Sequence, residues 1–318
     1  MMRSMKPHTP AWHDLQYNNR GRIPEFPAIL QHWADASADA RARLASALDV
    51  PYSQRGADDP AERLDIFRPS TRAATLAPVL VYLHGGYWRA LDKRDQSFIA
   101  APFVDAGAVV VLPNYSLCPA VSVQDIVLQT VQAVAWVARH VAEYGGDARR
   151  MVVAGHSAGG HLAAMLLSCR WPDVGVDLPA DLVTTALSVS GVFDLEPLRH
   201  APFLAGDLKL TRSAAARVSP VHLPAPCGRL WAVVGSDESE EFLRQNALIR
   251  EAWGARAVPV CETLPGRHHM NVLHDLADPQ ARLHAMARQL LGLSPADDGS
   301  PDGGSPFNRA TNSASIGT

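Results

Sequence analysis

One short segment has the spacing of a nucleophilic serine. Residues 155–160 read Gly-His-Ser-Ala-Gly-Gly, after the apolar β-rich run Met151–Ala154 and before a helical pattern that begins at Ala158. A G-x-S-x-G segment between a strand and a helix forms a sharp turn that exposes the serine hydroxyl, beside a helix N-terminus that favours negative charge. A plain Gly/Ser turn is the alternative for the motif taken alone. In this setting the sequence predicts that Ser157 is the nucleophile of an acyl-transfer enzyme.

A second glycine-rich turn lies upstream of that segment. The apolar run Pro78–Leu83 is followed by residues 84–88, which read His-Gly-Gly-Tyr-Trp. Paired glycines after a strand let backbone N–H groups face a developing oxyanion, and a further donor is the N–H of the residue after the nucleophile. We therefore expect an oxyanion hole formed by the backbone of these residues: Gly85, Gly86, Tyr87 and Ala158.

An acid and a histidine must follow the serine in that chain order. Asp237 and Glu238 follow the apolar run Leu230–Val234, and His268 and His269 follow the next strand. Adjacent residues at a loop tip point in different directions, so only one residue of each pair can serve. The histidine would accept the serine proton, and the carboxylate would hold its tautomer. No H-x-x-x-H or cysteine partner accompanies the histidines, so we expect no metal site.

Short apolar runs alternate with longer helical patterns between the two ends of the chain. This alternation predicts an α/β fold, a single domain with a doubly wound, mostly parallel sheet and helices on both faces. Reactive groups gather at the carboxyl ends of strands in such a sheet. The Pro-rich stretch 200–227 interrupts the alternation and is expected to pass over the site. The expected strands are Leu64–Arg68, Val79–Leu83, Val109–Leu112, Met151–Ala154, Ala186–Ser190, Leu230–Val234 and Val258–Thr263. The expected helices are Pro27–Leu48, Arg94–Asp105, Ser122–Tyr144, Ala158–Cys169, Glu240–Trp253 and Pro279–Leu291.

Composition narrows the class of protein. The 318 residues are 47% hydrophobic, which is enough apolar material for a full core. The net charge of −3 provides no strong positive potential that would bind a nucleic acid. No apolar run approaches the roughly 20 residues that span a bilayer. Four scattered cysteines and no visible secretory signal predict a cytosolic protein with reduced thiols. We expect a flexible segment at residues 1–16, the domain at 17–293 and a disordered tail at 294–318.

These residues resemble the α/β-hydrolase superfamily, and more narrowly kynurenine formamidase (arylformamidase) and its esterase relatives with an H-G-G-x-W motif. The resemblance runs from about Tyr17 to Leu291, and residues 84–88 and 155–160 match the two motifs in full. Residues 114–117 resemble the family's N-Y-R-L segment, and residues 190–195 resemble its S-G-V-Y-D-L stretch.

The resemblance implies roles for single residues. The family's acid stands fourth in a small-x-x-D segment, which favours Glu238 over Asp237 although Asp is usual there. The family's histidine lies in a D-H-F segment, which favours His269 over His268. The implied activity is cleavage of N-formylkynurenine through an acyl-serine, without a cofactor. An aromatic leaving group would need an aromatic pocket, for which the expected walls are Tyr87, Trp88 and Phe193.

Two other functions and the assembly state stay open from the sequence. A carboxylesterase of the same fold, acting on small acyl or aryl esters, would share the triad and differ only in pocket shape. A ligand-binding protein on this scaffold should have lost a triad member, and this sequence has lost none. The expected partner is a small-molecule substrate rather than a nucleic acid or a membrane. The sequence does not decide whether the protein forms a homodimer.

Overall fold

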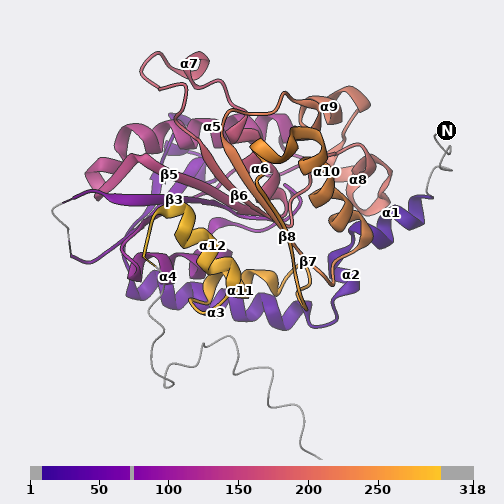
Figure 1. Cartoon of the computed structure of the whole chain (residues 1–318), viewed down its shortest axis with the longest axis horizontal. Coiled ribbons are helices and arrows are strands. Elements are labelled where there is room, and N and C mark those ends of the chain that lie inside the picture. Colours follow the sequence, from indigo (N-terminus) through magenta and orange to yellow (C-terminus); the bar gives the residue numbers. More distant parts are fainter. Residues whose placement is uncertain (1–8, 72–74, 295–318) are drawn as a thin grey trace, which may run out of the picture.

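The computed structural model describes residues 9–71 and 75–294, which form one α/β unit around an eight-stranded sheet (Figure 1). The strand order is β1-β2-β4-β3-β5-β6-β7-β8. Strand β2 runs antiparallel to both of its neighbours, and the pairs from β4 to β8 are parallel. The strands are β1 (Ala45–Pro51), β2 (Arg63–Arg68), β3 (Ala77–Leu83), β4 (Val109–Pro113), β5 (Gly146–His156), β6 (Thr185–Val189), β7 (Arg229–Gly235) and β8 (Val260–Leu264). The predicted mostly parallel sheet is confirmed.

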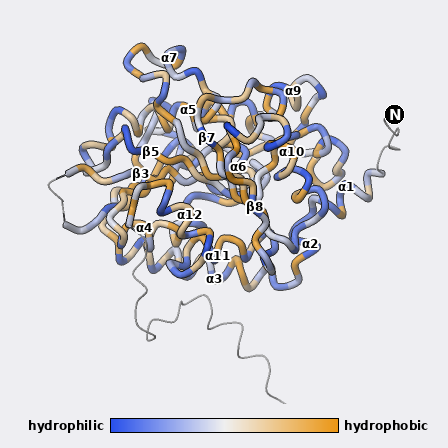
Figure 2. Tube along the Cα trace, viewed as in Figure 1, coloured by the Kyte–Doolittle hydropathy of each residue, from blue (hydrophilic) through white to orange (hydrophobic). Residues whose placement is uncertain are grey.

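Helices cover both faces of the sheet because the central strands are apolar on both sides. In β3, Val79 and Val81 belong to one buried cluster, while Leu80 and Tyr82 belong to the other. The first cluster packs against α5 (Val123–His140), α6 (Ala158–Leu167) and α10 (Glu240–Ala257). The second packs against α3 (Phe26–Arg43), α4 (Ala100–Asp105), α11 (Val272–Ala277) and α12 (Arg282–Leu291). Figures 1 and 2 show these two helical layers on either side of the apolar sheet.

Helix α3 ends earlier than the sequence predicts. The expected helix Pro27–Leu48 ends at Arg43, and Ala45–Pro51 pairs with β2 as an edge strand. The Ala- and Arg-rich composition of residues 40–48 favours a helix, but pairing with β2 outweighs this weak local preference.

The amino-terminal region also differs from the prediction. Residues 10–17 form helix α1 (Pro10–Tyr17), which begins with a Thr9 side-chain cap and contacts α8 (Pro202–Leu208) and α10. The expected flexible segment therefore does not extend to residue 16. Residues 1–8 and 295–318, which include nearly all of the expected tail, lie outside the described residues.

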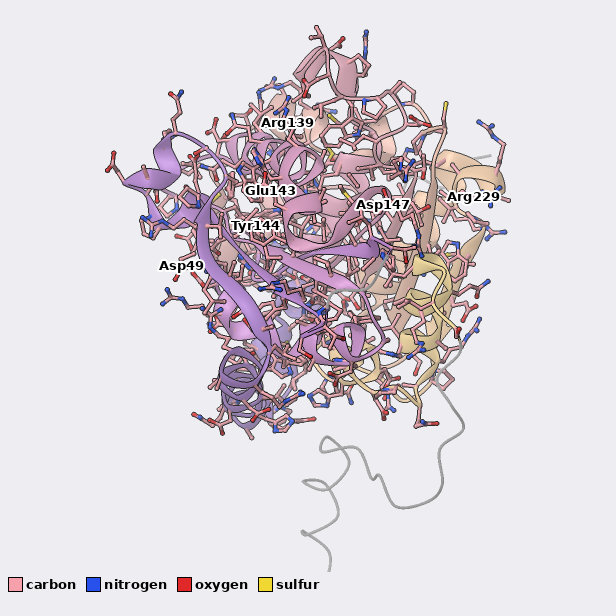
Figure 3. All side chains as sticks on the ribbon, turned by 90° about the vertical axis from the view of Figure 1, so that its left-hand side faces the viewer. Asp49, Arg139, Glu143, Tyr144, Asp147 and Arg229 are labelled. Atoms are coloured by element: carbon pink, nitrogen blue, oxygen red, sulfur yellow. The ribbon has the colours of Figure 1, made fainter. Side chains whose placement is uncertain are left out.

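Segments from distant parts of the sequence meet beside the carboxyl ends of the parallel strands. They are α1, the short helix α2 (Asn19–Arg22), α8 and α9 (Arg212–Arg217), and they lie at the right-hand side of Figure 1. Helices α8 and α9 belong to the stretch expected to pass over the site. Figure 3 faces the opposite side, where Asp147 and Arg229 stand near the beginnings of β5 and β7.

No helix within residues 9–71 and 75–294 is long and apolar enough to cross a membrane.

Candidate active site

Ser157 stands at the sharp turn between β5 and α6. Its backbone has φ 55° and ψ −115°, in a region that a non-glycine residue rarely adopts, and its N–H donates to the Val189 carbonyl over 2.8 Å. The glycines on each side permit close approach. A methyl group at Gly155 would lie 2.3 Å from the Gly159 backbone, and one at Gly159 would lie 2.0 Å from the Leu83 carbonyl oxygen. The predicted strand–turn–helix setting of Ser157 is present.

His269 and Glu238 come together at the ends of β8 and β7. The Nδ1 atom of His269 lies 2.7 Å from Oε2 of Glu238, and the two side chains are 5% and 0% exposed. The other Glu238 oxygen accepts hydrogen bonds from the Ser190 hydroxyl and from the Gly235 N–H. Three donors therefore hold this carboxylate, and its contact with Nδ1 leaves Nε2 of His269 outside that contact, as a proton acceptor in the predicted triad requires.

The alternative acid and the alternative base point elsewhere. Asp237 is exposed, and its carboxylate accepts a hydrogen bond from the Ser236 hydroxyl at 2.8 Å. His268 directs Nε2 toward Glu25 at 3.2 Å, and its Nδ1 accepts from two backbone N–H groups that follow it. The geometry therefore brings together Glu238 and His269 and excludes Asp237 and His268 from this contact.

The imidazole of His269 is fixed between two rings. The centroid of Phe242 lies 4.4 Å away, and that of His156 lies 4.6 Å away. His156 donates from Nε2 to the backbone carbonyl of His269 at 2.7 Å. Burial, with a contribution from His269, lowers the pKa of His156 well below its usual value. The lowered pKa favours a neutral His156 beside the ring of His269.

The His-Gly-Gly turn, residues 84–86, lies against Ser157. A methyl group at Gly85 would come within 3.3 Å of Cβ of Ser157. Gly86 has φ 108°, and a methyl group there would lie 2.0 Å from the Ala90 carbonyl oxygen, so this position requires glycine. Ala158 is the first residue of α6, where N–H groups have no partner within the helix. The two expected sources of oxyanion donors thus flank Ser157.

Buried polar contacts hold this turn from behind. His84 is fully buried, and its Nε2 lies 3.1 Å from Oδ1 of Asn114. The Tyr115 hydroxyl donates to the His84 carbonyl at 2.8 Å, and its ring stacks on the imidazole at 4.1 Å. Asn114 and Tyr115 belong to the segment that resembles N-Y-R-L. They position the turn and do not line the cleft.

Ser157 and His269 line one cleft, which encloses about 620 Å³ including its open mouth. Phe26, Trp33 and Phe203 provide aromatic walls. Tyr87 also lines the cleft, and its hydroxyl donates to the Tyr17 carbonyl at 2.7 Å, which ties the residue after the His-Gly-Gly turn to the end of α1.

Two of the three expected aromatic walls are wrong. Trp88 is fully buried, with its ring edge-on to His161 at 4.9 Å, and Phe193 is fully buried in the same apolar cluster. Neither residue lines the cleft. Trp88 points into the core because the turn at residues 86–88 has positive φ throughout and reverses the side-chain directions. Of the three, only Tyr87 faces the cleft.

Several residues of the site escaped the sequence analysis. Ser190, at the end of β6, lies in the segment that resembles S-G-V-Y-D-L, so the strand-end rule offered a signal for it. The cleft residues of α2 and α3 carried no such signal, because they precede the first strand of the parallel part of the sheet. They are Asn18, Asn19, Arg20, Phe26 and Trp33.

Known proteins are similar to this chain in sequence. The family description BD-FAE matches residues 64–171. A kynurenine formamidase from Danio rerio is 31% identical over 263 residues, covering 80% of this chain and 85% of that protein. The chain belongs to the kynurenine formamidase family of α/β-hydrolases.

Esterases are also similar to this chain. Esterase LipQ from Mycobacterium tuberculosis is 32% identical over 72% of this chain and 58% of its own length. A crystal structure of a candidate thioesterase from Silicibacter sp. TM1040 is 31% identical, with a TM-score of 0.73 over 85% of this chain and 96% of that chain. Esterase B from Lactobacillus rhamnosis shares the fold, with a TM-score of 0.66 at 18% identity, over 85% of this chain and 97% of that chain. This member of the kynurenine formamidase family is a hydrolase.

Proposed function

We propose that this protein hydrolyses an aryl formamide, converting N-formylkynurenine to kynurenine and formate. The observation that carries the proposal is the cleft that Ser157 and His269 share with Phe26, Trp33 and Phe203. The catalytic pair supplies hydrolysis, and the rings favour a flat aromatic leaving group. Similarity over most of their length to proteins named kynurenine formamidase supports the same substrate.

The proposed reaction has two halves. His269 accepts the Ser157 proton at Nε2, and Oγ attacks the formyl carbon, while the oxyanion forms against backbone N–H groups of Gly86 and Ala158. The protonated imidazole, stabilised by Glu238, gives its proton to the aniline nitrogen as the C–N bond breaks. His269 then takes a proton from water, which attacks the formyl-serine. The imidazolium returns this proton to Oγ of Ser157 as the bond between Oγ and the formyl carbon breaks and formate leaves.

A carboxylesterase is the second candidate, because esterase relatives such as LipQ match this chain at a similar identity. The same machinery would cleave small acyl or aryl esters. A non-catalytic binding protein is disfavoured by the intact contact between His269 and Glu238. A fluorophosphonate probe that labels Ser157 would separate either enzyme from the binding protein.

The proposal extends to the setting of the enzyme. Its partner is a small molecule, and its place is the cytoplasm, within the degradation of tryptophan. A protein with no bound cofactor could act there alone or as a pair of identical chains.

The test is the kcat/KM value for N-formyl-L-kynurenine, with p-nitrophenyl acetate as the comparison substrate. A value above about 10⁴ M⁻¹s⁻¹ for the formamide, within the range of ordinary enzymes, supports the arylformamidase. Ser157→Ala serves as the blank and should lose about 10⁴- to 10⁶-fold in kcat. Turnover of the ester alone would assign the protein to the esterases. Near wild-type turnover by Ser157→Ala would overturn the serine mechanism.

A further inference from the structure

The cleft beside Ser157 carries positive charge and no compensating carboxylate in its lining. Its described lining residues include neither aspartate nor glutamate. Its charged side chains are two guanidiniums, those of Arg20 and Arg89. Its two imidazoles add no charge to this argument, because burial lowers the pKa of His156 and Glu238 accompanies His269. A cleft of this kind favours a ligand with a negatively charged group.

The guanidinium of Arg89 is already engaged by the protein. Its Nη1 pairs with the carboxylate of Asp207 and donates to the Phe203 carbonyl at 2.7 Å. The Cζ atom also lies 5.4 Å from the centre of the Phe203 ring. Arg89 therefore braces α8 at the edge of the cleft, and Asp207 offsets its charge.

Arg20 differs from Arg89 in having no such partner. It lies on the short helix α2, is exposed to solvent, and forms no ion pair within the part of the chain that the structure describes. Its Cζ atom stands 4.9 Å from the centre of the Phe26 ring, and Phe26 is itself a wall of the cleft. This cation–π contact holds the guanidinium at the cleft wall and leaves its N–H donors free for a ligand.

We propose that Arg20 binds a carboxylate on the leaving group of the substrate and so sets the specificity of the site. A formyl group has no room for an anion, so the charge must sit on the aryl side, where Phe26 lies beneath Arg20. A planar guanidinium can engage both oxygens of a carboxylate. This inference rests on the proposed function for the formamide, and it assigns recognition of the substrate carboxylate to Arg20.

The experiment compares anionic and neutral substrates in the full chain. The substrates are N-formyl-L-kynurenine against formanilide, and 3-(2-acetoxyphenyl)propanoate against phenyl acetate. For Arg20→Gln we expect the ratio of kcat/KM, anionic over neutral, to fall about ten- to hundredfold, mainly through KM. Arg20→Lys should recover part of the ratio, because it keeps the charge without the planar fork. Added salt should reduce the wild-type ratio.

Arg22→Gln is the matched control. Arg22 is an exposed arginine on the same helix, but it lies outside the Ser157 cleft, so its loss should leave the ratio unchanged. An unchanged ratio in Arg20→Gln, or an equal loss for both members of a pair, would overturn the inference. If the wild-type protein cleaves no formamide, the proposed function fails, and the ester pair still decides the role of Arg20.

Discussion

His156, the residue directly before Ser157, holds the loop that carries His269. Nε2 of His156 donates to the backbone carbonyl of His269 over 2.7 Å, and the two imidazole centroids lie 4.6 Å apart. The turn that exposes Ser157 is thereby tied to the loop that delivers His269. These segments are separated by three strands in the sequence, so this single hydrogen bond joins two distant parts of the site.

Replacing His156 with phenylalanine keeps a ring against His269 and removes that donor. We expect His156→Phe to lower kcat about tenfold with little change in KM, because small displacements of a catalytic group are costly. His284→Phe is the control, since His284 is also buried, bonds a backbone carbonyl (Leu276, 2.9 Å) and stacks on Phe103 at 4.6 Å. Equal losses of stability with no difference in kcat would show that His156 has no positioning role.

The carboxylate that orients His269 is distinguishable from its neighbour by mutation. We expect Glu238→Gln to lower kcat about 10³- to 10⁴-fold, since an amide would stabilise the wrong tautomer of the imidazole. Asp237→Asn should stay within about threefold of wild type, because the Asp237 side chain is exposed and bonded only to Ser236 among the described residues. Steady-state kinetics on either substrate class measures both. A severe loss in Asp237→Asn would reverse the assignment.

Two glycine variants distinguish the loss of the expected oxyanion donors at Gly86 from the effect of backbone strain alone. Gly86→Ala would place a methyl group 2.0 Å from the Ala90 carbonyl oxygen, and should lower kcat/KM about 10²- to 10³-fold by displacing the donors. Gly107→Ala shares the positive φ (94°) but meets no atom within 4 Å. Gly107→Ala should lose about 1 kcal/mol of stability through its positive φ alone, and Gly86→Ala should lose more because of the added clash, both measured by urea unfolding. The idea fails if Gly107→Ala loses as much activity as Gly86→Ala.

The sequence predicts the parts of the site that local rules govern. The turn at Ser157 and the glycines at 85 and 86 follow from strand, turn and helix signals a few residues long. The fold follows from the alternation of apolar runs and helical patterns. Only the resemblance favours Glu238 over Asp237, because the direction of a side chain at a loop tip depends on the backbone conformation of residues 235–239. In the structure, Ser190 and the Gly235 N–H hold that carboxylate toward His269.

The walls of the cleft could not be predicted in the same way. Phe26 and Trp33 reach the site because α3 packs across the sheet, a contact that no short segment of sequence encodes. Trp88 has the composition of a pocket wall, yet positive φ at residues 86–88 turns it into the core. The edge strand β1 was missed for a related reason, since its pairing with β2 is non-local.

The buried His161 makes stability depend on pH in a defined window. Burial lowers its pKa to about 4, from about 6.5 in an unfolded chain. Between these values the unfolded state binds a proton that the folded state does not, so stability is full above pH 6.5 and is lost as the pH falls toward 4. One such group contributes about 3 kcal/mol over this window, at about 1.4 kcal/mol per pH unit.

Urea unfolding at several pH values gives the slope of the free energy of unfolding against pH. For His161→Gln this slope should be smaller than the wild-type slope by the contribution of about one proton. Parallel curves for the two proteins would mean that His161 takes up its proton in the folded state, beneath Trp88.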